Sequence, residues 1–325
     1  MKKLIIIIIA TLMLAGCTKP TTSDKPKDEK LVIGIITWVT HPALDAAVEG
    51  MIEEVTALVG EDKVTFILKN ANADESSAQL ISKDFVDQKV DLIYAVATPS
   101  LTAAFGATLD SKTPIIFSAV TDAVAAGVVE SNEVPNTNVS GVSDAAPIQT
   151  QLNLIKEILP NASKIGMLYN LSEINGKIQV DQATELAAGM GLEVVAKGIS
   201  QDSEITLAAQ QLATTTDAFY IITDNKIISS IATVVNQANN SGIPVFAAES
   251  GQMAAGLLAS DSLSYFNMGK LAGTMIVKVL VDKVDIATLP VVTEGATQLF
   301  VNKSVADSLN ITLPQAVLDR AEIID

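Results

Sequence analysis

The sequence is poor in several residues that commonly build binding and catalytic sites: its 325 residues include one cysteine, one histidine and one tryptophan. Arg320 is the only arginine. A single cysteine, Cys17, excludes an intrachain disulfide and a cysteine metal cluster. A formal net charge of -16 makes nucleic acid an unsuitable partner, because phosphate binding needs clustered cations. An anionic group must therefore be held by backbone N–H groups, hydroxyls, amides or a lysine instead of an arginine clamp.

The strings that mark common catalytic and nucleotide sites are also missing. The chain has no GxSxG, no His-Glu-x-x-His, no GxxxxGK[ST], and no GxGxxG after a strand. His41 could serve a surface hydrolase only with a serine nucleophile on a strained turn, so it is better explained as a helix cap or a cleft-edge donor. We therefore expect no enzyme, no catalytic residue, no metal and no cofactor.

The first thirty residues read as an export and anchoring segment. Two lysines precede an apolar run from Leu4 to Ala15, which is too short to span a bilayer. The string Leu-Ala-Gly-Cys ending at Cys17 resembles the bacterial lipoprotein signal, in which the cysteine carries lipid. We predict a signal peptide at 1–16 and a lipidated cysteine with a polar, flexible tether at 17–30. The protein would be extracytoplasmic and lipid-anchored to the bacterial cell membrane.

The folded part begins with a strand, a turn and a helix. Residues Leu31 to Ile36 are apolar apart from Gly34, which is typical of a parallel strand covered on both faces. Pro42 suits the first turn of a following helix. Trp38 lies between them, at the carboxyl end of the strand, where ligands bind in open α/β sheets. It is either a stacking surface for a ligand or a side chain packed under a loop.

The same pattern occurs twice along the chain. Later strands repeat the anchors of the first half in the same order and at nearly constant separation. Such an ordered repeat predicts two similar α/β lobes in tandem, each a Rossmann-like parallel sheet, joined by a multi-strand hinge. The paired anchors are Gly34 with Gly166, Asp91 with Asp217, and Pro114 with Pro244.

The later segments define the expected lobe boundaries. Leu257 to Ala259 and an apolar helical stripe from Tyr265 to Val281 exceed what the second repeat needs, so we expect them to return to the first lobe. The final short strand, Leu299 to Asn302, could join either lobe. The predicted lobes are therefore 31–143 with about 253–285, and 144–252 with about 286–325.

Several segments together resemble a known family. They are THPALDAA, TPSLTAA, FSAVTDAVAAGVV, SGVSDAAPIQTQLNLIKEILPNASKIGMLYN, TDNKIISSI and GIPVFA. This series resembles the substrate-binding lipoproteins of ABC transporters typified by tryptophan- and tyrosine-binding members. The resemblance implies a type I periplasmic-binding fold, a ligand held between two lobes, and a membrane permease and ATPase as partners. Where that family usually has glutamine and glutamate after the first strand, this chain has Thr37 and Thr40.

The turns at strand ends supply the predicted ligand contacts, which are rich in hydroxyls, amides and carboxylates. The loop at 169–176 could hold a ligand carboxylate at a helix start, or could be capped by Ser172 or Asn175. The acidic members could pair with a ligand amine or cap helices. The candidates of the first lobe are Trp38, Thr40, His41, Thr98, Ser100, Thr121 and Asp122. Those of the second lobe are Tyr169, Asn170, Ser172, Glu173, Asn175, Thr223, Asp224, Asn225 and Glu249.

We therefore expect a receptor that closes over a small zwitterionic solute, with an aromatic amino acid favoured by Trp38 and by the resemblance. The closed form would deliver the solute to an ABC permease and its ATPase. One alternative is a sensory lipoprotein that signals to a membrane kinase. Another is a receptor for a sugar or a nucleoside, because the fold alone does not choose the ligand.

Overall fold

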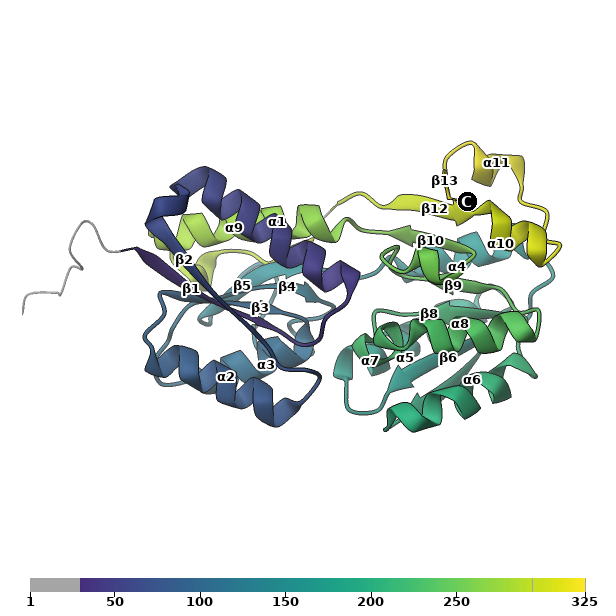
Figure 1. Ribbon diagram of the computed structural model, residues 1–325, viewed down its shortest axis with the longest axis horizontal. Coiled ribbons are helices and arrows are strands. Elements are labelled where there is room, and N and C mark those ends of the chain that lie inside the picture. Colours follow the sequence, from purple (N-terminus) through teal and green to yellow (C-terminus); the bar gives the residue numbers. More distant parts are fainter. Residues whose placement is uncertain (1–29, 294, 325) are drawn as a thin grey trace, which may run out of the picture.

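Two sheets lie side by side, each flanked by helices, in the computed structural model (Figure 1). It describes residues 30–293 and 295–324. None of the helices within these residues is long and apolar enough to cross a membrane.

The first lobe contains a six-stranded sheet in the order β11-β5-β4-β3-β1-β2, and its strand pairs are all parallel. Helices cover both faces of this sheet, so its central strands are buried, as their apolar runs predicted. The strands are β1 (Leu31–Thr37), β2 (Val64–Asn70), β3 (Leu92–Val96), β4 (Ile115–Val120), β5 (Val139–Ser143) and β11 (Val292–Thr293). The helices are α1 (Pro42–Val59), α2 (Glu75–Asp87), α3 (Thr98–Ala107) and α9 (Tyr265–Leu280).

The second lobe contains a seven-stranded sheet in the order β13-β12-β10-β9-β8-β6-β7, parallel except where β12 pairs with β10. The strands are β6 (Lys164–Asn170), β7 (Glu193–Ile199), β8 (Ala218–Ile221), β9 (Val245–Ala247), β10 (Ala259–Ser262), β12 (Gln298–Asn302) and β13 (Glu322–Ile324). The helices are α4 (Ile148–Ile158), α5 (Ile174–Ala188), α6 (Ile205–Ala213), α7 (Asn225–Ser229), α8 (Ile231–Asn240), α10 (Lys303–Ser308) and α11 (Gln315–Leu318). Short 3-10 turns are η1 (Glu61–Lys63), η2 (Asp202–Glu204), η3 (Met253–Ala255) and η4 (Ile286–Thr288).

The two aspartates of the sequence repeat, Asp91 and Asp217, make equivalent hydrogen bonds in the two lobes. Asp91 Oδ2 accepts a hydrogen bond from the backbone N–H of Val32 at 2.8 Å, at the start of β1. Asp217 Oδ2 accepts one from the N–H of Lys164 at 2.9 Å, at the start of β6. Each carboxylate precedes the neighbouring strand and fixes the register of the first strand of its lobe. The repeat is therefore structural.

The proline anchors also match, and the glycine anchors Gly34 and Gly166 each lie against a phenylalanine ring. The carbonyl of Pro114 accepts from the N–H of Ile93, and the carbonyl of Pro244 accepts from the N–H of Phe219, each at 2.9 Å. A Cβ added to Gly34 would lie 2.8 Å from the Phe85 ring. Because an aromatic ring packs directly on β1 there, a side chain at this position would displace it. The duplicated α/β architecture predicted from the sequence is confirmed.

The chain crosses between the lobes at three places within the described residues, which form the hinge. The crossings follow β5, β10 and β11. The expected boundaries near 253 and 286 are therefore wrong by several residues. Leu257 to Ala259 belongs to the second lobe, because β10 pairs with β9 there. The strand that the sequence left unassigned is β12, which lies antiparallel to β10.

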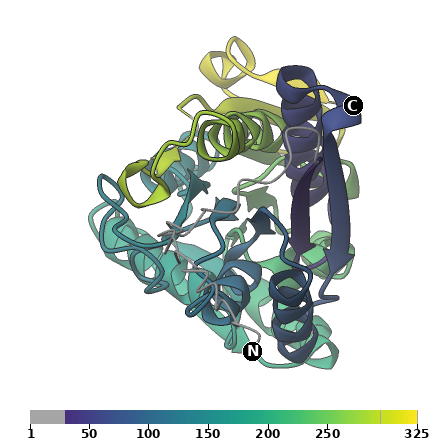
Figure 2. The ribbon, with the colours of Figure 1, turned by 90° about the vertical axis from the view of Figure 1, so that its left-hand side faces the viewer.

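Helix α9 packs against α1 of the first lobe, and the two lie side by side in both views (Figures 1 and 2). Glycines make this contact close: a Cβ on Gly269 would lie 2.1 Å from the carbonyl oxygen of Ala47. A Cβ on Gly50 would lie 2.1 Å from the carbonyl oxygen of Phe266. The return of this helix to the first lobe is as predicted, and it ties the lobe to the hinge.

Candidate functional site

The carboxyl ends of the central strands of both lobes face one another across a cleft. The hydroxyl oxygens of Thr121, after β4, and Thr223, after β8, lie 3.4 Å apart across it. A Cβ on Gly251, in the second lobe, would lie 3.2 Å from the ring of Pro42 at the start of α1. The lobes are therefore in contact, and the cleft is closed at this depth.

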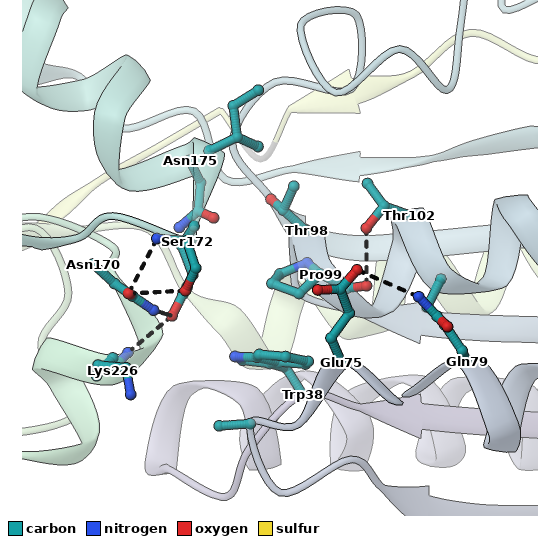
Figure 3. A pocket seen from close by; sticks show the side chains of 14 residues that line it. Trp38, Glu75, Gln79, Thr98, Pro99, Thr102, Asn170, Ser172, Asn175 and Lys226 are labelled. Carbon is teal, nitrogen blue, oxygen red and sulfur yellow. Dashed lines mark hydrogen bonds between the residues drawn. The ribbon is translucent and has the colours of Figure 1, made fainter. Parts of the chain in front are cut away.

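An outer pocket of about 310 Å³ lies between the lobes, with contributions from each (Figure 3). Trp38 lies at its base with its side chain largely buried, and its Nε1 has no hydrogen-bond partner in the described part of the chain. Trp38 therefore packs against the core of the first lobe and also lines the pocket, where a ligand ring could stack on it. The first lobe lines the pocket mainly with Trp38, Glu75, Gln79, Thr98, Pro99 and Thr102. The second lobe contributes Asn170, Ser172, Glu173, Ile174, Asn175 and Lys226.

A second, inner cavity lies deeper in the cleft and shares Asn175 with the outer pocket. Its volume is about 10 Å³, close to the minimum for one water molecule. Its polar lining comes from both lobes and comprises His41, Thr121, Asp144, Asn175, Thr223, Asn225, Glu249 and Tyr265.

Two carboxyl groups meet at the inner cavity. Asp144 Oδ2 accepts a hydrogen bond from the Tyr265 hydroxyl at 2.9 Å, while its Oδ1 is buried without a partner in the described residues. Glu249 Oε2 is likewise buried and unpaired there. Burial raises the pKa of Asp144 to about 6. Burial, and then the charge of Asp144, raise the pKa of Glu249 to about 8. The raised pKa values mean that burial disfavours the charged form of both carboxyls, so a cation bound between them would stabilise that form.

His41 lies beside these carboxyls without neutralising them. Burial lowers its pKa to about 4, against a smaller opposing effect of its hydrogen bond to Asn225, so the imidazole is uncharged at neutral pH. Its Nδ1 has no partner within the described residues. His41 stands at the N-cap position of α1 but its side chain makes no capping bond. Of the two roles proposed for it, the cleft-facing one fits the geometry.

Glu173 and Asp224 serve the architecture of the second lobe. Glu173 accepts from the side-chain amides of Asn170 at 3.0 Å and Asn225 at 2.6 Å. Asp224 caps α7 by accepting from the N–H of Ile227 at 3.1 Å, and also accepts from the N–H of Asn170 at 2.6 Å. Burial raises the pKa of Asp224, and the charge of Glu173 adds to this. For Asp224, the helix-cap alternative is the one that the structure shows.

Three predicted contacts lie away from both cavities. Thr40 accepts from the Asn70 side chain at 2.8 Å on the outer face of the first lobe. Tyr169 packs against Gly198 of β7, since neighbouring side chains of a strand point to opposite faces. Asp122 accepts from the N–H of Ala125 at 2.9 Å and closes a turn. Position after a strand does not fix the direction of a side chain, and these three residues line neither cavity.

The start of α3 is a candidate anion site at the outer pocket. Ala97, just before it, has a φ of 78°, which a residue other than glycine rarely adopts, and no side chain caps the helix. Thr98 begins α3 at the pocket, and the first N–H groups of a helix have no partner within the helix itself, apart from Pro99, which has no N–H. At α5, neither Ser172 nor Asn175 is the N-cap, and the carboxylate of Glu173 stands there instead.

Ser100 is buried in the first turn of α3, and its hydroxyl has no partner among the described residues. Five residues that line the cavities were not predicted from the sequence: Asp144, Tyr265, Glu75, Gln79 and Lys226. Asp144 follows β5 directly, so its position at a strand end was the available signal. The others lie on helices and become neighbours only through folding.

Two α/β lobes that close over a polar cleft, with the chain crossing between them three times, define a solute-binding protein of the type I periplasmic-binding fold. The chain belongs to the family of ABC transporter substrate-binding proteins, whose profile matches residues 32–324. Members of this family work outside the cytoplasm and bind solutes, and they are not enzymes. The expectation that this protein is not an enzyme is thereby confirmed.

Individual relatives and solved structures are similar to this chain over nearly its whole length. The chain is 40% identical over 323 residues to the tyrosine-binding protein of Clostridioides difficile, covering 95% of this chain and 93% of that one. An ABC domain from Streptococcus pneumonia in complex with L-Trp superposes with a TM-score of 0.88 at 32% identity. The match covers 91% of this chain and 100% of that one. A ligand-free, open substrate-binding protein with adhesive properties from Clostridium difficile superposes with a TM-score of 0.70 at 37% identity. The match covers 91% of this chain and 99% of that one.

The lobe arrangement can be inferred from these superpositions. The open protein is the more similar in sequence, yet it superposes less well than the L-Trp complex at the same coverage of this chain. The two lobes of this structure are therefore arranged more as in the complex than as in the open protein, and Thr121 and Thr223 meet between them. We refer to this arrangement, in which the lobes are in contact, as the closed form.

Proposed function

We propose that this protein is the solute receptor of an ABC importer and that it binds a free aromatic amino acid, tyrosine or tryptophan, between its lobes. The observation that carries the proposal is a group of buried polar atoms that face the cleft from both lobes without partners in the described chain. Trp38 Nε1 is a donor, whereas Asp144 Oδ1 and Glu249 Oε2 are acceptors. A zwitterion has a carboxylate that can accept from the Trp38 N–H and an ammonium group that can donate to the two carboxyl oxygens. The named relatives support the aromatic side chain.

The proposed pose follows from the two cavities. The ligand ammonium lies between Asp144 and Glu249, each of which keeps one buried oxygen without a partner in the described residues. The carboxylate lies toward the start of α3 and the Trp38 N–H. The aromatic ring extends past Asn175 into the outer pocket, over Trp38 and beside Pro99. We assign the other predicted residues that line the cavities, Thr98, Thr121, Asn170, Ser172, Thr223 and Asn225, to the walls of this site.

Closure follows from contacts to both lobes at once. Asp144 belongs to the first lobe and Glu249 to the second, so an ammonium group bridges them only when the lobes are together. A ligand shifts a conformational equilibrium only by binding one state more tightly than the other. The closed form would then deliver the amino acid to the permease and ATPase of the transporter.

We expect tyrosine or tryptophan to raise the melting temperature and to bind in calorimetry, because a ligand that binds only the native state stabilises it. N-acetyltyrosine, which lacks the ammonium group, should leave the melting temperature unchanged. Copurified ligand is removed first by unfolding and refolding. If refolded protein responds to neither amino acid, or responds equally to the N-acetyl derivative, the proposed ligand class is wrong.

We also propose that the protein is anchored to the membrane through lipid on Cys17, after removal of residues 1–16; both lie outside the described residues. Replacing Cys17 with serine should release the protein into the medium or periplasm, because the thiol is the site of lipid attachment. Cell fractionation and the mass of the mature protein measure this. A Cys17→Ser protein that still fractionates with the membrane would contradict the anchor.

A further inference from the structure

The closed cleft brings two carboxyl groups together where no cation balances them. Asp144 follows β5 of the first lobe, and Glu249 follows β9 of the second. Both are essentially inaccessible, and each keeps one oxygen without a partner in the described residues. Burying an uncompensated carboxylate is costly, and two that face each other add their repulsion. The closed form therefore has to acquire positive charge at this place.

The groups that face the pair do not supply that charge. His41, before α1, is uncharged because burial lowers its pKa to about 4. Tyr265, at the start of α9, donates one hydrogen bond to Asp144 and is itself held neutral because burial raises its pKa. The remaining polar groups of this lining are uncharged: Thr121, Asn175, Thr223 and Asn225. Lys226 lines the outer pocket and pairs with Asp202 at 2.8 Å.

We propose that Asp144 and Glu249 form a proton site that substitutes for the ligand cation, so that acid closes the lobes without ligand and protons compete with the ligand's ammonium group. Acid closure without ligand concerns the chain alone. The competition between protons and the ammonium group rests on the proposed function. In an anchored receptor the arrangement would make ligand capture weaker as the medium becomes acidic.

The direction of the effect follows from linkage. In open lobes both carboxyls meet water, where their pKa values return to about 4. In the closed form the pKa of Asp144 is about 6 and that of Glu249 about 8. His41 acts in the opposite direction, because burial lowers its pKa to about 4 in the closed form. The two carboxyls outweigh this one group, so the closed form binds more protons and closure is favoured below the open-state pKa values of the carboxyls. That advantage is lost as the pH rises through about 6 and then 8. Each proton taken up changes the closed-to-open ratio on the order of tenfold per pH unit.

The test uses the full chain without ligand, from pH 5 to pH 9, and follows acrylamide quenching of the fluorescence of Trp38, the only tryptophan. Trp38 is 7% exposed in the closed form and lines the pocket between the lobes, so we expect opening to expose it to the quencher. We expect weak quenching at pH 5 and strong quenching at pH 9. Glu249→Gln, which keeps the shape and removes the charge, should stay closed to higher pH. Glu185→Gln, on an exposed face of α5, should follow the wild type.

Quenching that is the same at all pH values, or identical in wild type and Glu249→Gln, overturns the proposal. Circular dichroism checks that each variant is folded, and Asp144→Asn is the second variant if Glu249→Gln is not. The quenching needs no ligand, so acid closure in a protein that binds no amino acid would reject the proposed function alone. If amino acids bind, the affinity should fall several-fold from pH 8 to pH 5. A constant affinity would overturn the competition.

Discussion

The double substitution Asp144→Asn with Glu249→Gln is expected to weaken the binding of tyrosine or tryptophan at pH 8 by at least about 100-fold. Each hydrogen bond to a charged group contributes about 1.5–3 kcal/mol, and this change removes both carboxylates from the ammonium site. A residual pair of amides would also turn N–H donors toward a cation. Isothermal titration calorimetry on protein freed of copurified ligand measures the loss.

The matched control for this experiment is Glu185→Gln, which removes one negative charge from an exposed position of the second lobe. It should bind as the wild type does, so a general effect of net charge is excluded. Circular dichroism verifies the fold of the double variant. Should the double variant bind within about threefold of the wild type, the ammonium does not lie between these carboxyls. Each single substitution should weaken binding by about tenfold or more.

The substitution Gly269→Ala is expected to lower the free energy of unfolding by about 3 kcal/mol. The added Cβ would lie 2.1 Å from the carbonyl oxygen of Ala47 and 2.9 Å from the backbone nitrogen of Met51. Both are backbone atoms of α1, so no side-chain rotation relieves the contact and the two helices must separate. Urea unfolding with the linear extrapolation measures the change.

Gly106→Ala provides the control for this prediction, because it places the same methyl group where nothing lies within 4 Å. Gly106 lies in the last turn of α3, and alanine stabilises a helix by up to roughly 0.5–1 kcal/mol relative to glycine, the larger values applying to interior positions. The two glycine-to-alanine changes should therefore have opposite signs. A Gly269→Ala protein as stable as the wild type would show that α1 and α9 are not packed this closely.

Much of the fold could be predicted from the sequence because it depends on patterns among residues that are close together in the chain. The apolar run before Thr37, the proline at the start of α1, and the repeat of Asp91 at Asp217 are local patterns. Each was found where expected, and the repeated aspartates hold β1 and β6 in register in the same way. The last third of the chain was harder to assign, since β10 and β12 pair with strands distant in sequence.

The site was less predictable, for a geometric reason. Strand ends identified the correct edge of each sheet, so Trp38, Thr98 and Asn175 do line the cleft. The direction of each side chain depends on the local backbone, which turned Thr40 and Tyr169 away. Partners that lie on helices, such as Glu75 of α2 and Tyr265 of α9, become neighbours of the cleft only when the elements pack.

The sequence by itself determined that this chain has two similar α/β lobes, few cations and no recognisable catalytic string, because composition and hydrophobic periodicity act residue by residue. Only the tertiary structure decided that Asp144 and Glu249, which belong to different lobes, bury their carboxyls against each other in the closed cleft. The physical reason is that the electrostatic energy of a carboxyl depends on the distance to other charges and on the exclusion of water, which lobe closure sets.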